Sequence, residues 1–101
     1  MKISIITVCF NSQQTIKATI KSVLNQSYKQ VEYIIIDGAS TDNTIKIINE
    51  FSNSIDVFVS ENDAGIYDAI NKGITKSSGD IVGLLHACLL YTSDAADDTS
   101  G

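Results

Sequence analysis

Cysteine is scarce in this 101-residue sequence, and proline is absent. The two cysteines, Cys9 and Cys88, have no metal-ligand spacing and form no disulfide framework, so the sequence predicts a reduced, cytoplasmic compartment. No apolar run is long enough for a membrane span, and the short run after Lys2 is too interrupted for a signal peptide. We therefore expect no membrane segment in this chain.

Basic residues are also few, because 12 acidic residues face 7 basic ones and the net charge is −5. This balance disfavours nonspecific binding to nucleic acid or to an anionic membrane, so we expect no nucleic-acid partner. Glycine-rich phosphate motifs are missing as well. No G-x-G-x-x-G follows the first expected strand and no G-K-[ST] occurs, which argues against a dinucleotide-binding dehydrogenase and a Walker-type site.

What is present is an alternation of apolar runs and amphipathic stretches, with 44% apolar residues as in soluble globular domains. β-branched runs predict strands, and apolar residues at helical spacing predict the helices between them. We expect strands at 3–10, 31–36, 56–60 and 81–85, and helices at about 12–25, 42–51 and 66–76. This order indicates an α/β fold with right-handed crossovers and a Rossmann-like parallel sheet.

The stretch from residue 34 to residue 44 organises the chain. Three isoleucines at 34–36 suit a strand buried on both faces, and Asp37 ends it. Side-chain oxygens at 40–42 can then cap the following helix. Ligands of open α/β sheets bind beyond the carboxyl ends of the strands, which is where Asp37 lies. A plain Asp-Gly turn explains the same residues equally well.

Other polar groups follow the strand ends, namely Thr7, Asn11, His86 and the loop 61–65. Such a set suits hydrogen bonding to a base and a ribose, with the Asp37 carboxylate accepting from a ring N–H or a sugar hydroxyl. A lone histidine at a strand end is more often structural than catalytic.

Lys72 and Asp68 are the charged residues nearest to this arrangement on the third expected helix. A solvated helix face explains both of them better than a binding role does, because they alternate with the apolar stripe.

Together these motifs resemble family 2 glycosyltransferases of the GT-A fold, over residues 2–87. Residues 5–11 resemble the first strand of the family, and residues 36–44 its D-G-x-S-x-D-x-T signature. Residues 60–74 are similar to S-E-x-D-x-G-I-Y-D-A-x-N-K-G, and residues 79–87 to the strand that leads into the metal site.

The resemblance implies transfer of a sugar from a nucleoside-diphosphate donor to an acceptor hydroxyl, on a glycan or a lipid-linked glycan. It also implies a donor nucleotide site, whose expected residues are Thr7, Cys9, Asn11, Asp37, Asp68 and Lys72.

The family places an acidic pair after the fourth strand, where it holds Mg²⁺ or Mn²⁺ on the diphosphate. Here Cys88 and Leu89 follow Ala87 instead, and no acceptor-binding half or general base follows. We therefore expect neither catalytic nor metal-ligating residues in this chain, and an inactive fragment of an active parent protein.

Residues 88–98 have a resemblance of their own, to an in-frame translation of a transposon-end sequencing adapter. We expect residues 1–87 to form the N-terminal part of a GT-A domain, truncated after the fourth strand, and residues 88–101 to be a non-native or disordered tail. Asp94, Asp97 and Asp98 would then only mimic a metal motif.

Three other interpretations compete with this one. A nucleotidyltransferase-like nucleotide-binding domain usually has a glycine-rich, basic loop after the first strand, which residues 9–14 lack. A receiver-like signalling domain would have an acidic pair after the first strand and an aspartate ending the third, for which Asp63 is a poor substitute. The third interpretation is a truncated reading frame without function. If the sheet is truncated after the fourth strand, we expect an uncovered edge and face that invite aggregation.

Overall fold

The computed structural model describes residues 2–26 and 30–86, with only the backbone of His86. Its elements are β1 (Ile3–Cys9), α1 (Ile16–Leu24), β2 (Val31–Asp37), α2 (Thr44–Asn49), a 3₁₀ turn (Ser52–Ser54), β3 (Val57–Ser60), α3 (Ile66–Lys76) and β4 (Ile81–His86). The strands form one parallel sheet in the order β3-β2-β1-β4. The predicted α/β, Rossmann-like fold is confirmed.

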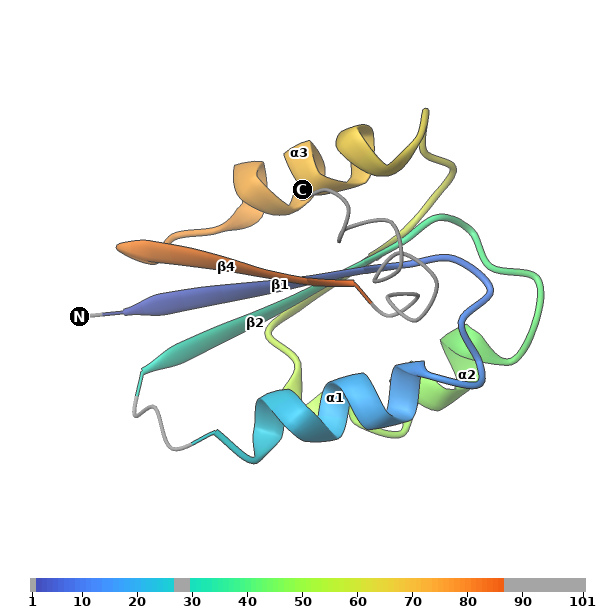
Figure 1. The fold of residues 1–101 in the computed structure, drawn as a ribbon, viewed down its shortest axis with the longest axis horizontal. Coiled ribbons are helices and arrows are strands. Elements are labelled where there is room, and N and C mark those ends of the chain that lie inside the picture. The colour runs from blue at the N-terminus through green and yellow to red at the C-terminus, as the bar shows by residue number, and fades with distance from the viewer. Residues whose placement is uncertain (1, 27–29, 87–101) are drawn as a thin grey trace, which may run out of the picture.

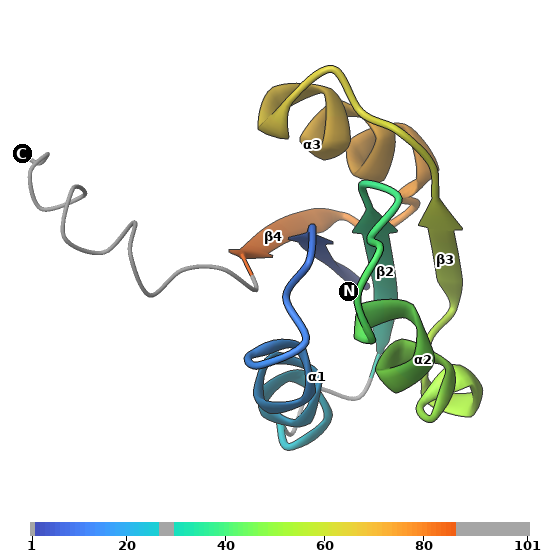
Figure 2. The same cartoon turned by 90° about the vertical axis from the view of Figure 1, so that its right-hand side faces the viewer.

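The sheet is the middle of three layers, with α1 and α2 on one face and α3 on the other (Figure 1). In Figure 2, β2 and β3 lie on one side of β1 and β4 lies on the other. The strand order therefore reverses at β1, and in such sheets ligands bind beyond the carboxyl ends of the strands near the reversal.

Two apolar clusters fill the space between the layers. One joins the helices α1 and α2 to the sheet, and the other joins α3 to the opposite face. Successive residues of β1 and β2 point to opposite faces, so residues 34–36 are fully buried without being all on one side. The predicted strand buried on both faces is thus confirmed.

Several boundaries differ from those predicted. The strand β1 ends at Cys9, because Phe10 turns outward with 56% of its surface exposed and Asn11 has a left-handed φ of 48°. The helix α2 is shorter than 42–51, because the chain tightens into the 3₁₀ turn after Glu50. Leu24 was expected in the buried stripe of α1, but it lies at the helix end and is 40% exposed.

The helix α3 packs closely on the sheet, but it covers mainly β1 and β2. A Cβ on Gly73 would lie 2.5 Å from Cγ2 of Ile6, so glycine permits the helix to approach β1. Ile66 and Ile74 were expected in the buried stripe, but both are exposed because α3 covers β1 and β2. Val82 and Leu84 of β4 are exposed too, so among the described residues β4 is an uncovered edge strand, as expected.

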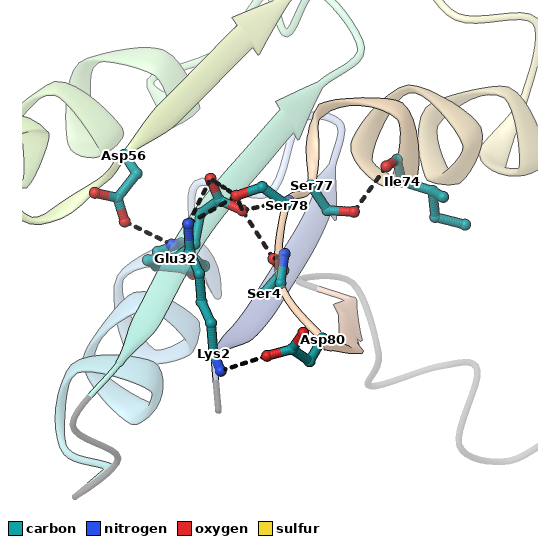
Figure 3. A network of polar contacts seen from close by, with 10 residues as sticks. Lys2, Ser4, Glu32, Asp56, Ile74, Ser77, Ser78 and Asp80 are labelled. Atoms are coloured by element: carbon teal, nitrogen blue, oxygen red, sulfur yellow. Dashed lines mark hydrogen bonds and ion pairs between the residues drawn. The ribbon is translucent and has the colours of Figure 1, made fainter.

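A polar network fastens the amino ends of the strands, away from the predicted site (Figure 3). Oε1 of Glu32 accepts hydrogen bonds from Oγ of Ser4 at 2.8 Å and from the backbone N–H of Ser78 at 2.9 Å. Oγ of Ser4 accepts in turn from the N–H of Gly79 at 2.8 Å. The Ser78 N–H in particular lowers the pKa of Glu32. This network ties the segment before β4 to β1 and β2.

No helix in the described part of the chain has both the length and the apolar character needed to span a membrane.

Candidate functional site

The candidate site is a cavity of about 440 Å³ beyond the carboxyl ends of β1 and β2, which is where the sequence predicts it. Its walls come from the end of β1, the turn after β2, the loop between β3 and α3, and the first turns of α3. The lining residues are Val8, Cys9, Phe10, Gly38, Asn62, Asp63, Gly65, Ile66 and Ala69. Most of the lining is apolar, with few polar groups, which is typical of small-molecule sites.

Asp37 is fully buried and lies beside this cavity rather than in its lining. Oδ2 accepts from the N–H of Ser40 at 2.9 Å and from Oγ of Ser60 at 2.8 Å. Oδ1 accepts from Oγ of Ser40 at 2.5 Å and from Sγ of Cys9 at 3.4 Å. The carboxylate therefore joins the ends of β1, β2 and β3 to the turn after β2. In this structure these four hydrogen bonds all come from within the chain.

Asn11 fastens the loop after β1 to the same turn. Its Oδ1 accepts from the N–H of Thr41 at 2.8 Å, and its own N–H donates to Oγ of Ser40 at 2.8 Å. Its left-handed backbone suits asparagine, which adopts that region more readily than most residues. Asn11 thus fixes the position of the turn that contains Gly38, and Gly38 lines the cavity.

Cys9 and Thr7 belong to the same face of β1 but differ in their surroundings. Cys9 lines the cavity and is almost fully buried. Thr7 is fully buried between the sheet and the first two helices, where its hydroxyl shares a hydrogen bond of 2.9 Å with the Tyr33 hydroxyl. Burial raises the pKa of Tyr33 to about 12. The structure therefore brings Cys9 to the cavity and leaves Thr7 in the core.

Asp68 and Lys72 lie on the outer side of the loop between β3 and α3, where they line a second hollow of about 390 Å³. Nζ of Lys72 lies 2.6 Å from Oδ1 of Asp63, 2.9 Å from Oε2 of Glu61 and 3.7 Å from Oδ2 of Asp68. Its hydrogen bonds to Asp63 and Glu61 raise the pKa of Lys72.

Asp68 also accepts from the N–H of Ala64 at 2.9 Å, just before α3 begins. Asp68 and Lys72 thus line the second hollow and not the cavity. Asp63, which does line the cavity, connects to that hollow through its ion pair with Lys72.

Of the nine lining residues, Cys9 alone was among the predicted site residues. The other eight are Val8, Phe10, Gly38, Asn62, Asp63, Gly65, Ile66 and Ala69. All eight lie in segments that resemble family motifs, but nothing in the one-dimensional pattern distinguishes Asp63 from its acidic neighbours. Of His86, the backbone pairs with Val8 at the end of β4.

Within residues 2–26 and 30–86, no group of three or more histidine, cysteine, aspartate or glutamate residues could hold a metal ion. Asp94, Asp97 and Asp98 lie outside the described residues.

The family model for glycosyl transferase family 2 matches residues 4–96 of this chain. The chain belongs to glycosyltransferase family 2. The matched segment includes all the described elements from β1 to β4, and it extends past the boundary expected at residue 87 into residues that the structure does not describe.

Curated glycosyltransferases share this sequence at moderate identity. An uncharacterized glycosyltransferase of Mycobacterium tuberculosis, Rv1514c, is 38% identical over 86 residues, which make up 84% of this chain and 33% of that protein. The poly-β-1,6-N-acetyl-D-glucosamine synthase of Staphylococcus epidermidis is 39% identical over 95 residues, or 92% of this chain and 23% of the synthase. The chain thus spans between 23% and 33% of the length of these relatives.

Solved glycosyltransferase structures share the fold. Staphylococcus aureus TarS 1–349 in complex with UDP-GlcNAc has a TM-score of 0.79 at 22% identity, covering 99% of this chain and 32% of that one. The mannosyltransferase PcManGT from Pyrobaculum calidifontis, in complex with GDP-Man and Mn²⁺, has a TM-score of 0.78 at 22% identity, covering 85% and 27%. At these identities the likeness establishes the fold of this glycosyltransferase chain, and nothing about its donor.

Proposed function

We propose that this chain is the donor-binding part of a glycosyltransferase that transfers a sugar from a nucleoside-diphosphate donor to an acceptor hydroxyl. The observation that carries the proposal is the cavity of about 440 Å³ beyond β1 and β2, in a chain of this family. Its size is within the range of sites for small ligands. Solved proteins of the same fold hold UDP-GlcNAc or GDP-Man, which supports a nucleotide sugar here.

In this proposal, the apolar walls take the flat base and the polar groups orient it. Val8 and Ala69 form the floor, while the exposed side chains of Phe10 and Ile66 stand at the opening. Cys9 contacts the nucleoside directly. Asp37 and Asn11 act through the turn that they hold, Thr7 acts through the core, and Asp68 and Lys72 act from outside the cavity.

A divalent ion on the diphosphate would stabilise the leaving group as its charge develops. The described residues offer no cluster that could hold such an ion. We propose that the parent protein uses Mg²⁺ or Mn²⁺ through ligands beyond the described residues, since two solved proteins of this fold contain Mn²⁺. Its acceptor, in our proposal, is a glycan or a lipid-linked glycan on the cytoplasmic side.

The domain boundary is a further part of the proposal: residues 1–87 are glycosyltransferase sequence and residues 88–101 are a non-native tail. Sequencing the same locus with a library that lacks the transposon-end adapter tests this directly. A native codon sequence for residues 88–98 would contradict it.

Isothermal titration of the 101-residue chain with UDP and GDP tests donor binding. We expect saturable heat with at least one nucleotide at a dissociation constant near the millimolar range, about −4 kcal/mol. The absence of heat with both nucleotides at millimolar concentration would overturn the proposal.

A further inference from the structure

Among the described residues the sheet has two edge strands, β3 and β4, and they differ in how well they are protected (Figure 2). The strand β3 is only four residues long. Acidic residues flank it, Asp56 before the strand and Glu61 after it. Short length and charge are usual means by which proteins keep an edge strand from pairing with another chain. The strand β4 has six residues, and none of residues 81–85 is charged, so β4 is the unprotected edge.

The strand β4 also keeps apolar side chains in water. Ile81 is 49% exposed, Val82 40% and Leu84 45%. Leu84 pairs in register with Ile6, which packs against α3, so Val82 and Leu84 lie on the face of the sheet that α3 covers mainly over β1 and β2. On the opposite face, a Cβ added to Gly83 would meet no atom within 4 Å. Apolar area is therefore open on both faces of this edge, and its burial would be favourable.

The element that covers this edge must be a strand. The side of β4 away from β1 pairs with no described strand, and its backbone N–H and C=O groups are a template for another one. Residues 87–101 follow β4 in the same chain and lie outside the described residues. If they folded back through a two-residue turn, Ser93 would lie opposite Val82. The next residue, Asp94, would lie opposite Ile81. Polar and charged groups would then oppose the exposed apolar ones, which is a poor cross-strand match.

A second copy of β4 matches the edge better. Residues that lie opposite each other in a sheet point to the same face, so a two-fold axis between antiparallel copies passes beside a residue. With the axis beside Gly83, Val82 lies opposite Leu84 of the second copy. Ile81 then lies opposite Leu85 of the second copy, so each exposed apolar residue of 81–85 meets an apolar one. No like charges oppose each other within this stretch, and glycine at the axis permits close approach.

We propose that the 101-residue chain forms a two-fold symmetric dimer, in which β4 pairs antiparallel with β4 of a second copy about Gly83. Two four-stranded sheets then join into one sheet of eight strands. The inference is independent of the proposed function, because the cavity is lined by residues of other elements. One strand pair is a small interface, below the roughly 1,000 Å² of a stable complex, so the dimer should dissociate on dilution.

Sedimentation velocity of the native chain from about 5 μM to about 500 μM tests the dimer. We expect the average mass to rise from that of one chain toward that of two over this range. Each copy has a net charge of −5, so raising NaCl from about 0.05 M to about 0.5 M should strengthen the association. Hydrogen exchange read by NMR should show slower exchange of amides within 81–85 at the higher protein concentration, with the amides of β3 unchanged.

Two double variants test the register. Val82→Lys/Leu84→Lys places like charges opposite each other across the axis, and Val82→Lys/Leu84→Glu places opposite charges there. Because symmetry creates two such pairs, the second variant should dimerise about 10-fold more tightly than the first. Leu24→Lys is the matched control and should dimerise like the native chain, because Leu24 is also 40% exposed but lies at the end of α1. Circular dichroism identifies any variant that fails to fold, and the exchange measurement on the native chain keeps the test decisive in that case.

Each other result overturns the inference. A native chain that stays monomeric at all concentrations has no such dimer. Slow exchange in β4 of a monomer would mean that the tail of the same chain covers the edge. Growth beyond two copies would mean open-ended association, and equal affinity of the two folded double variants would exclude the register. Equal weakening by Leu24→Lys and by the like-charge variant would place the contact elsewhere.

Discussion

Replacement of Asp37 tests whether its carboxylate stabilises the fold around the site or contacts the ligand directly. The buried carboxylate accepts from the Ser40 N–H, the Ser40 and Ser60 hydroxyls and the Cys9 thiol. In Asp37→Ala these donors lose their acceptor, and each buried donor left unsatisfied costs about 1–3 kcal/mol. Because the two hydroxyls can rotate to other partners, we expect a total loss of about 3–5 kcal/mol in the free energy of unfolding.

Urea unfolding followed by circular dichroism measures this loss. Ser60→Ala removes one of the donors and should cost about 1–2 kcal/mol, which keeps the comparison open if Asp37→Ala does not fold. Asp80→Asn is the control. Asp80 is exposed and accepts one hydrogen bond, from the N–H of Lys2 at 3.0 Å, so its replacement should change stability by less than about 0.5 kcal/mol. An Asp37→Ala chain of native stability that no longer binds nucleotide would refute the bracing role.

Three further predictions concern the cavity, the core and the amino ends of the strands. Gly38→Ala places a methyl group 3.1 Å from Oδ2 of Asp63, so nucleotide affinity should fall about 10-fold in calorimetry, with a melting temperature within a few degrees of the native value. Gly73→Ala forces a Cβ to within 2.5 Å of Ile6 in the buried layer, and urea unfolding should show a loss of about 1–3 kcal/mol. The pKa of Glu32 is lowered in the folded state from its ordinary value of 4.5, so stability should fall as the pH drops below about 4.5, and Glu32→Gln should reduce that acid dependence in melts at pH 3–7. Unchanged nucleotide affinity in Gly38→Ala would contradict the first prediction, and unchanged stability in Gly73→Ala would contradict the second. An unchanged dependence of stability on pH in Glu32→Gln would contradict the third.

The fold was predictable because its signals are periodic. The isoleucine run before Asp37 indicates a strand buried on both faces, and the stripe of Ile16, Ile20 and Val23 indicates the buried face of α1. The exposure of Ile66 and Ile74 was not predictable, because it depends on how many strands α3 covers, and hydrophobic spacing does not contain that information.

The place of the site was predictable for a similar reason, since parallel strands bring their carboxyl ends to one edge. The roles of single residues were not. Asp37 ends a strand, which predicts a ligand contact, but its hydrogen bonds to the serines at 40 and 60 depend on how distant segments meet. Asp63 is one acid among several in its loop, and only the three-dimensional structure shows that it lines the cavity and pairs with Lys72.

The central claim is that a nucleotide binds in the cavity beyond β1 and β2. The most direct measurement is an ¹H–¹⁵N NMR titration of the 101-residue chain with UDP and GDP, which reports the backbone N–H of each affected residue. We predict shifts that saturate at Cys9, Gly38, Asp63 and Gly65, which line the cavity. Shifts confined to the second hollow around Lys76, or no shifts with either nucleotide, would contradict the account.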